Sequence, residues 1–75
     1  LYINNNKINW IDAKNYYGAN TILIKKNLIK QIDKYYDKLG PGAIVFNLGY
    51  SSKLEQQFDN NKILLLSFND FEKIK

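Results

Sequence analysis

The chain has 75 residues, a formal net charge of +4, and neither cysteine nor histidine. A chain of this length forms one small domain at most, and the missing residue types exclude disulfides, thiolate or imidazole zinc sites, and Ser/His or Cys/His nucleophiles. Chemistry near neutral pH is left to carboxylate, lysine and tyrosine side chains, which favour oxygen-bound Mg²⁺ or Mn²⁺ as the metal.

All the positive charge comes from lysine, because the chain contains no arginine. Lysine neutralises phosphates as a point charge, whereas arginine makes the bidentate contact that most often reads guanine. A nucleic-acid partner would therefore be bound with little sequence preference. A few extra lysines are also common in soluble domains of any function. No apolar run reaches the roughly 18 residues that span a bilayer, so no membrane partner is expected.

The chain opens with the pattern of a β-hairpin. Residues 1–3 are extended, and the three asparagines that follow favour a turn, because asparagine tolerates left-handed backbone angles. Residues 8–14 then predict a strand whose side chains alternate between two faces. One face is predicted to carry Ile8, Trp10, Asp12 and Lys14, and the other Asn9, Ile11 and Ala13.

Residues 21–39 have the period of an amphipathic helix, with Asn20 or Thr21 as the N-cap and residues 40–42, Gly-Pro-Gly, as the stop. The predicted apolar half consists of Ile22, Ile24, Leu28, Ile29, Ile32, Tyr35, Tyr36 and Leu39. The opposite half carries Lys26, Lys30, Lys34 and Lys38 with Asp33 and Asp37. We interpret this half as a solvated face, because the interleaved acids weaken it as a nucleic-acid surface.

The second half of the chain predicts two more strands. Residues 43–50 are nearly all apolar, as in a strand that is buried on both faces. A helical turn is expected around residues 54–58, a strand at 62–68 and a short helix at 69–75. The order β-β-α-β-β predicts an α/β domain with a mixed β-sheet, in which the covering crossover helix makes its flanking strands parallel.

Asp12 and Lys14 are the candidate catalytic residues. Two positions apart on a strand, they project from the same face, roughly 7 Å apart between Cα atoms. A carboxylate there can hold a divalent metal, and the lysine can orient water or stabilise charge on a phosphoryl group. The Ala13 carbonyl is a further possible metal ligand. Most Asp-x-Lys tripeptides are surface charges, so the strand context carries the interpretation.

Several motifs in order give the chain a family resemblance. They are Trp-Ile-Asp-Ala-Lys at 10–14, Tyr-Gly at 17–18, Gln-Ile-Asp-Lys-Tyr at 31–35, Gly-Pro-Gly at 40–42 and Gly-Tyr at 49–50. This pattern, over roughly residues 8–50, resembles the TPD family, which includes the codanin-interacting nuclease and belongs to the PD-(D/E)XK nuclease superfamily. The resemblance implies a restriction-endonuclease-like core, of which residues 1–75 would form the C-terminal half as one domain fragment.

The resemblance also implies roles for individual residues. Asp12 stands at the superfamily's second acidic position, commonly Glu in this family, and Lys14 is the catalytic lysine. Gln31 and Tyr35 match a Gln-x-x-x-Tyr pattern whose residues support the site or touch nucleic acid, although Tyr35 also suits plain helix-to-sheet packing. Tyr16 and Tyr17 lie in the loop beside the site and can either stack on a base or cover a core edge. Trp10 is expected to pack under the helix.

The resemblance implies a Mg²⁺- or Mn²⁺-dependent nuclease that hydrolyses phosphodiesters, with DNA as the expected substrate. The family's Thr-Pro-Asp, whose Asp is a principal metal ligand, would lie in a strand before Leu1, so we expect ligands from outside this chain to complete the site and this fragment alone to be inactive. A nuclear or cytoplasmic location and a codanin-like partner are expected on the same ground. The alternative is a non-catalytic nucleic-acid- or protein-binding module that retains the fold.

Overall fold

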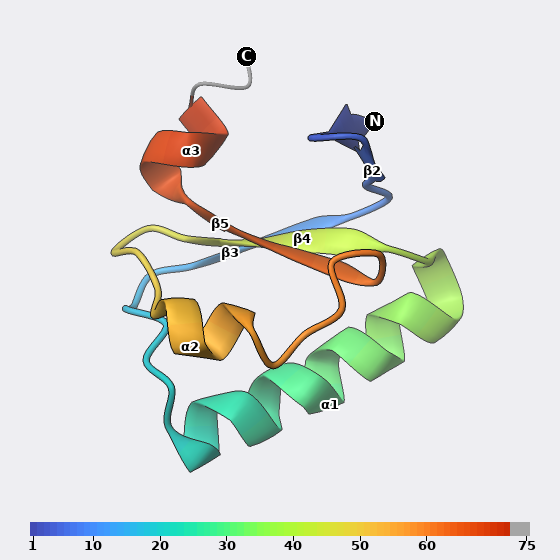
Figure 1. Cartoon of the computed structure of the whole chain (residues 1–75). Helices are drawn as coiled ribbons and strands as arrows, with labels where there is room; N and C mark the ends of the chain where they lie inside the picture. Colours follow the sequence, from blue (N-terminus) through green and yellow to red (C-terminus); the bar gives the residue numbers. More distant parts are fainter. Residues whose placement is uncertain (73–75) are drawn as a thin grey trace.

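The computed structural model describes residues 1–72 and has a three-layer arrangement (Figure 1). The middle layer is a parallel sheet of β3 (Ile11–Lys14), β4 (Gly42–Phe46) and β5 (Ile63–Ser67), in the order β3-β4-β5. Helices α1 (Ile22–Leu39) and α2 (Ser52–Glu55) cover one face. The hairpin of β1 (Tyr2–Ile3) and β2 (Asn6–Lys7) and helix α3 (Phe68–Glu72) lie on the other. The chain is thus a small α/β domain.

The hairpin forms as predicted. Strands β1 and β2 pair antiparallel, with Ile3 opposite Asn6. Asn4 and Asn5 between them have φ angles of 51° and 66°, the left-handed values that a two-residue hairpin loop requires at both central positions. The predicted mixture of antiparallel and parallel pairing is therefore present, but the described strands divide it between a separate hairpin and a three-stranded parallel sheet.

The predicted crossover geometry is confirmed. Strands β3 and β4 are parallel neighbours, with Asp12 opposite Ile44 and Lys14 opposite Phe46. Helix α1 connects them and begins after Thr21, whose Oγ1 accepts a hydrogen bond from the Ile24 N–H. It ends at Gly40, which has a φ of +87° and donates its N–H to the Tyr36 carbonyl. Both helix ends match the sequence prediction.

Strand β4 is buried on both faces, as its composition predicted. Its even-numbered residues Ile44 and Phe46 belong to a core under the helices, whereas Ala43 and Val45 belong to a core under the hairpin. The helix-side core consists of Trp10, Leu28, Ile32, Ile44, Phe46, Leu54, Ile63 and Leu65. The hairpin-side core consists of Ile3, Ile8, Ala43, Val45, Leu64 and Leu66.

The predicted strand at residues 8–14 is wrong at its start, because β3 begins only at Ile11. The chain bends at Asn9, whose backbone N–H donates to the Pro41 carbonyl at 2.8 Å and whose Nδ2 donates to the Leu39 carbonyl at 2.7 Å. Strict alternation ends at this bend. Ile8 therefore packs in the hairpin-side core, on the opposite face of the sheet from Trp10.

The predicted apolar half of α1 is also too wide. Ile22 is 83% exposed, and Ile29 is 47% exposed. Tyr36 and Leu39 are likewise exposed. A helix lying on a sheet buries only a stripe of its surface, and in α1 this stripe is centred on Leu28 and Ile32. Ile22, Ile29 and Tyr36, seven residues apart, lie at its margin, while Leu39 lies at the helix end.

The remaining elements are shorter than predicted but of the predicted kind. The helical turn expected at 54–58 is α2 (Ser52–Glu55), the strand expected at 43–50 ends at Phe46, and the last strand is confined to Ile63–Ser67. The final helix begins one residue early, at Phe68, and residues 73–75 of that prediction lie outside the described residues. No helix among residues 1–72 is both long and apolar enough to cross a bilayer.

Candidate functional site

The end of β3 brings Asp12 and Lys14 together, and α1 adds Gln31. Lys14 Nζ lies 2.8 Å from Asp12 Oδ2 and donates a hydrogen bond to Gln31 Oε1 at 2.7 Å. Gln31 Nε2 in turn donates to Asp12 Oδ2 at 2.9 Å. These three side chains, which we call the Asp12–Lys14–Gln31 triangle, thus close a ring of three polar contacts between the sheet and its covering helix.

The triangle leaves part of Asp12 free. Both contacts use Oδ2, and within residues 1–72 no hydrogen bond or ion pair engages Oδ1. The Asp12 side chain is 31% exposed and that of Lys14 21% exposed, so the site is shielded but open to a ligand. Asp12 therefore has one oxygen held by the protein and one oxygen available.

The Ala13 carbonyl faces the free edge of β3. The Trp10 and Lys14 carbonyls accept hydrogen bonds from Ala43 and Asn47, at the β4 side. Because the backbone groups of alternate residues in a strand face the same side, the Asp12 carbonyl also faces β4, and the Ala13 carbonyl faces away from it. In the described sheet β3 is an edge strand, so the Ala13 carbonyl is left without a partner from β4.

The surroundings of Asp12 favour its ionised form. Partial burial raises the pKa of the Asp12 carboxyl, but the hydrogen bonds from Lys14 and Gln31 and the attraction to the Lys14 charge outweigh it. The net result is a pKa below the ordinary value of 3.8. Asp12 is therefore a carboxylate, as a metal ligand has to be, throughout the neutral range.

Tyr35 has a packing role in this structure and also borders the site. Its ring meets that of Trp10 edge-on, with 5.0 Å between ring centres. Trp10 itself packs under α1, as predicted, and donates its indole N–H to the Gly40 carbonyl at 2.9 Å. Tyr35 also lines, with Gln31, a shallow hollow on the surface of α1. A role for Tyr35 in touching nucleic acid stays a prediction.

Tyr16 and Tyr17 lie in the loop that follows β3. Tyr16 packs edge-on against Phe46, with ring centres 5.9 Å apart, and is 40% exposed. Tyr17 is 49% exposed, and its ring lies beside Gly49. Both tyrosines therefore cover the end of β4 and also present ring surface to solvent, so the two roles considered for them are compatible. Stacking on a base stays a prediction.

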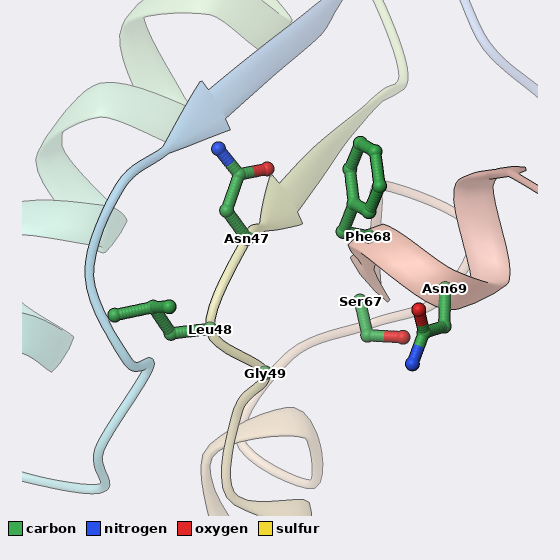
Figure 2. Close-up of a pocket in the computed structure, with 6 residues that line it drawn as sticks. All are labelled: Asn47, Leu48, Gly49, Ser67, Phe68 and Asn69. Atoms are coloured by element: carbon green, nitrogen blue, oxygen red, sulfur yellow. The ribbon is translucent and has the colours of Figure 1, made fainter.

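A second hollow lies at the carboxyl ends of β4 and β5, with a volume of about 280 Å³. Its lining residues are Asn47, Leu48, Gly49, Ser67, Phe68 and Asn69 (Figure 2). The Asn47 amide points toward the end of β3 and donates to Asn15 Oδ1. None of the lining side chains is charged, although Asp70 of α3 accepts a hydrogen bond from the N–H of the lining residue Ser67 at 3.4 Å.

Two lysines of the polar half of α1 lie close to the triangle. Lys30 and Lys34 line the hollow on α1, together with Asn27, Gln31 and Tyr35. Gln31 therefore belongs both to this hollow and to the triangle. No acidic residue lines the hollow. The prediction of a solvated face agrees with the exposure of Lys30 and Lys34, and the expectation that the interleaved acids weaken it as a nucleic-acid surface stays a prediction.

Comparison with known proteins places the chain in a family. The profile of a family described as "Protein of unknown function TPD sequence-motif" matches residues 1–68. The chain belongs to the TPD family. This TPD-family chain is also similar to the "Uncharacterized protein L539" of Acanthamoeba polyphaga mimivirus, with 43% identity over 47 residues. No solved structure matches it.

The similarity to the mimivirus protein covers 63% of this chain but only 17% of that relative. The TPD-family chain thus spans a small part of the length of the relative that it matches. The Asp12–Lys14–Gln31 triangle and the hollow on α1 both lie within the residues that the family profile matches. The activity, substrates and partners of a whole TPD-family protein are therefore treated below as proposals.

Proposed function

We propose that this chain supplies the lysine and one carboxylate to the active site of a metal-dependent nuclease of the PD-(D/E)XK superfamily, with a restriction-endonuclease-like core. The single observation that carries the proposal is the Asp12–Lys14–Gln31 triangle at the end of an edge strand. A carboxylate with one free oxygen and a lysine held beside it are the groups that phosphodiester hydrolysis needs on one side of the scissile phosphate.

The donor set suits Mg²⁺ or Mn²⁺ in part. Asp12 Oδ1 and the Ala13 carbonyl are hard oxygen donors at the same corner of the sheet, which is the ligand type these ions prefer. Residues 1–72 contain no group of three side chains that could hold a metal. The other ligands would come from phosphate, water and residues of a longer protein, for example on a strand that pairs with the free edge of β3.

Each residue of the triangle has a separate task. A bound divalent ion would polarise the phosphate and lower the pKa of a water ligand. Lys14 holds its ammonium group beside Asp12, where it stabilises the negative charge that grows on the phosphoryl oxygens. Gln31 fixes Lys14 through Oε1 and Asp12 through Nε2, so that both are positioned before a substrate arrives.

A cleavage assay tests this function in the intact natural protein that contains residues 1–75. Lys14→Ala should lower Mg²⁺-dependent cleavage of DNA by roughly 10²- to 10³-fold, the loss typical of one preorganised donor. The matched control Lys53→Ala removes an exposed lysine from α2 and should cut normally. Wild-type cleavage by the Lys14 variant would remove this residue from the mechanism.

A non-catalytic module is the second candidate, because the described residues supply a single carboxylate to the site and Lys14 already neutralises it. In that case the intact protein would bind nucleic acid or a protein partner without cutting, in Mg²⁺ and in Mn²⁺ alike. DNA as the substrate, a codanin-like partner and a nuclear or cytoplasmic location stay predictions of the family resemblance.

A further inference from the structure

One side of helix α1 carries lysines and amides next to the triangle. At 100° per residue, Asn27, Lys30, Gln31 and Lys34 fall within about 100° of one another on the side next to the triangle. Asp37 and Asp33 lie about 20° and 60° beyond Lys30 on the wheel, on the side away from Gln31. The helix surface therefore has a basic flank, defined here as Asn27, Lys30, Gln31 and Lys34, with the two acids at its border.

Asp33 is paired within the fold. Lys62, which immediately precedes β5, donates to Asp33 Oδ1 at 2.8 Å and lies 5.0 Å from the centre of the Tyr36 ring. The hydrogen bond to Asp33, followed by attraction to Asp33, Tyr36 and Asp37, raises the pKa of Lys62. Asp33 is thus paired with Lys62 rather than with a lysine of the basic flank, and Asp37 is near enough to Lys62 to be attracted to it.

The basic flank is hollowed and open. Its hollow has a volume of about 290 Å³ and is lined by Asn27, Lys30, Gln31, Lys34 and Tyr35. Lys30 and Lys34 are exposed, and no ion pair within residues 1–72 involves either of them. They are one helical turn apart, about 6 Å along the axis, which suits successive phosphates of a nucleic-acid strand. The flank therefore offers two unpaired cations and two amides beside the triangle.

We propose that the basic flank of α1 binds the sugar-phosphate backbone of the nucleic-acid strand that the Asp12–Lys14 site acts on. This inference rests on the proposed function, and Gln31 is the connection, because it lines the hollow and also contacts both Asp12 and Lys14. A strand whose phosphates bind Lys30 and Lys34 would therefore pass Gln31, which borders the Asp12–Lys14 pair. Lysine and amide donors bind phosphate without reading bases, so recognition is independent of sequence.

Fluorescence anisotropy of a labelled single-stranded DNA tests the flank, in EDTA so that neither metal nor cleavage contributes. The variant Lys30→Ala/Lys34→Ala is compared with Lys7→Ala/Lys53→Ala, which removes the same charge from exposed positions of β2 and α2. We expect the first pair to weaken binding about tenfold and to reduce the salt slope by about 1.4, since each phosphate contact on a single strand contributes about 0.7. The control should change far less.

Three results would overturn the inference: equal losses in both pairs, no binding by the wild type, or the same lysine dependence for a poly-glutamate peptide that competes with the DNA. Circular dichroism should find both pairs folded, because all four side chains are exposed. The cleavage assay separates this failure from that of the proposed function. If the intact Lys30→Ala/Lys34→Ala protein cuts DNA with an unchanged KM, the proposal that the basic flank binds the strand is wrong, whereas the proposed nuclease function is supported. If the flank binds DNA but the intact wild-type protein cuts nothing, the proposed nuclease function is wrong.

Discussion

Lys14 Nζ donates a hydrogen bond to Gln31 Oε1 at 2.7 Å, although the two residues are 17 positions apart and lie on different layers of the fold. The contact ties the end of β3 to the middle of α1. Because Gln31 also donates to Asp12, the amide holds the two charged side chains in one arrangement and prevents the lysine from moving freely to solvent. Gln31 is therefore the positioning residue of this site.

Replacing Gln31 by leucine should separate positioning from chemistry. Gln31→Leu keeps the side-chain size but removes both hydrogen bonds to charged groups, a type that contributes about 1.5–3 kcal/mol each when buried and less at a partly exposed site. In the intact protein we expect kcat to fall by about tenfold, the effect of a misplaced group, with KM nearly unchanged. The side-chain NMR signals of Lys14 should report greater mobility. Gln57→Leu, in an exposed turn, is the matched control, and a similar effect there would contradict the prediction.

The 75-residue chain alone should bind Mg²⁺ weakly. Mg²⁺ demands nearly octahedral oxygen coordination and releases water reluctantly, and the Asp12 charge is partly offset by Lys14 at 2.8 Å. In a titration followed by NMR, the shifts of Asp12 and Ala13 should not saturate at millimolar Mg²⁺ and should resemble those of the exposed Asp59. Tight saturable binding, abolished by Asp12→Asn, would instead mean that this chain holds a complete site.

Gly42→Ala should strongly destabilise the fold. A Cβ atom at Gly42 would lie 2.2 to 2.5 Å from atoms of the Trp10 indole, which is held under α1 by Tyr35 and by its bond to the Gly40 carbonyl. Overpacking of this kind costs about 1–3 kcal/mol or more. Thermal unfolding and the emission of Trp10, the only tryptophan, measure the effect. In a Trp10→Leu background the cost of Gly42→Ala should be smaller, and an equal cost would exclude this clash as its cause.

Tyr50 should make stability depend on pH in the alkaline range. Burial, followed by the charge of Glu55 and the hydrogen bond to it, raises the pKa of Tyr50 from 10.0 to about 12. Because the pKa is higher in the folded state, the stabilisation is complete below about pH 10 and is lost as the pH rises through about 12. Phenolate absorbance should contain a late-titrating tyrosine that Tyr50→Phe removes. Titration of all tyrosines together near pH 10 would contradict this.

Local sequence signals predicted the helix and the parallel crossover well. Thr21 and Gly40 determine the ends of α1 through contacts within one turn, and Ala43 to Phe46 are apolar on both faces because β4 is central. The bend at Asn9 was not predictable from alternation, since its partners Leu39 and Pro41 are some thirty residues away along the chain. That bend decides which core Ile8 enters.

The candidate site was predicted only in part, because local spacing is visible in the sequence and tertiary contacts are not. The spacing of Asp12 and Lys14 on a strand indicated their common face, and the family resemblance singled out Gln31 as a residue that supports the site. The basic flank was not predicted, because Asp33 and Asp37 share the polar half of α1 with Lys30 and Lys34. The pairing of Asp33 with Lys62, which immediately precedes β5, is a tertiary contact that the helix pattern alone does not reveal.

The free edge of β3 gives the site residues a second consequence, which concerns solubility. An unpaired strand edge that carries an exposed apolar residue such as Ile11, 42% exposed, is a template for pairing with another copy, and charges on such a strand oppose that pairing. Asp12 and Lys14 supply those charges. Variants that neutralise them should self-associate more readily than the wild type, so the residues suited to phosphodiester chemistry also keep this edge from seeding aggregates.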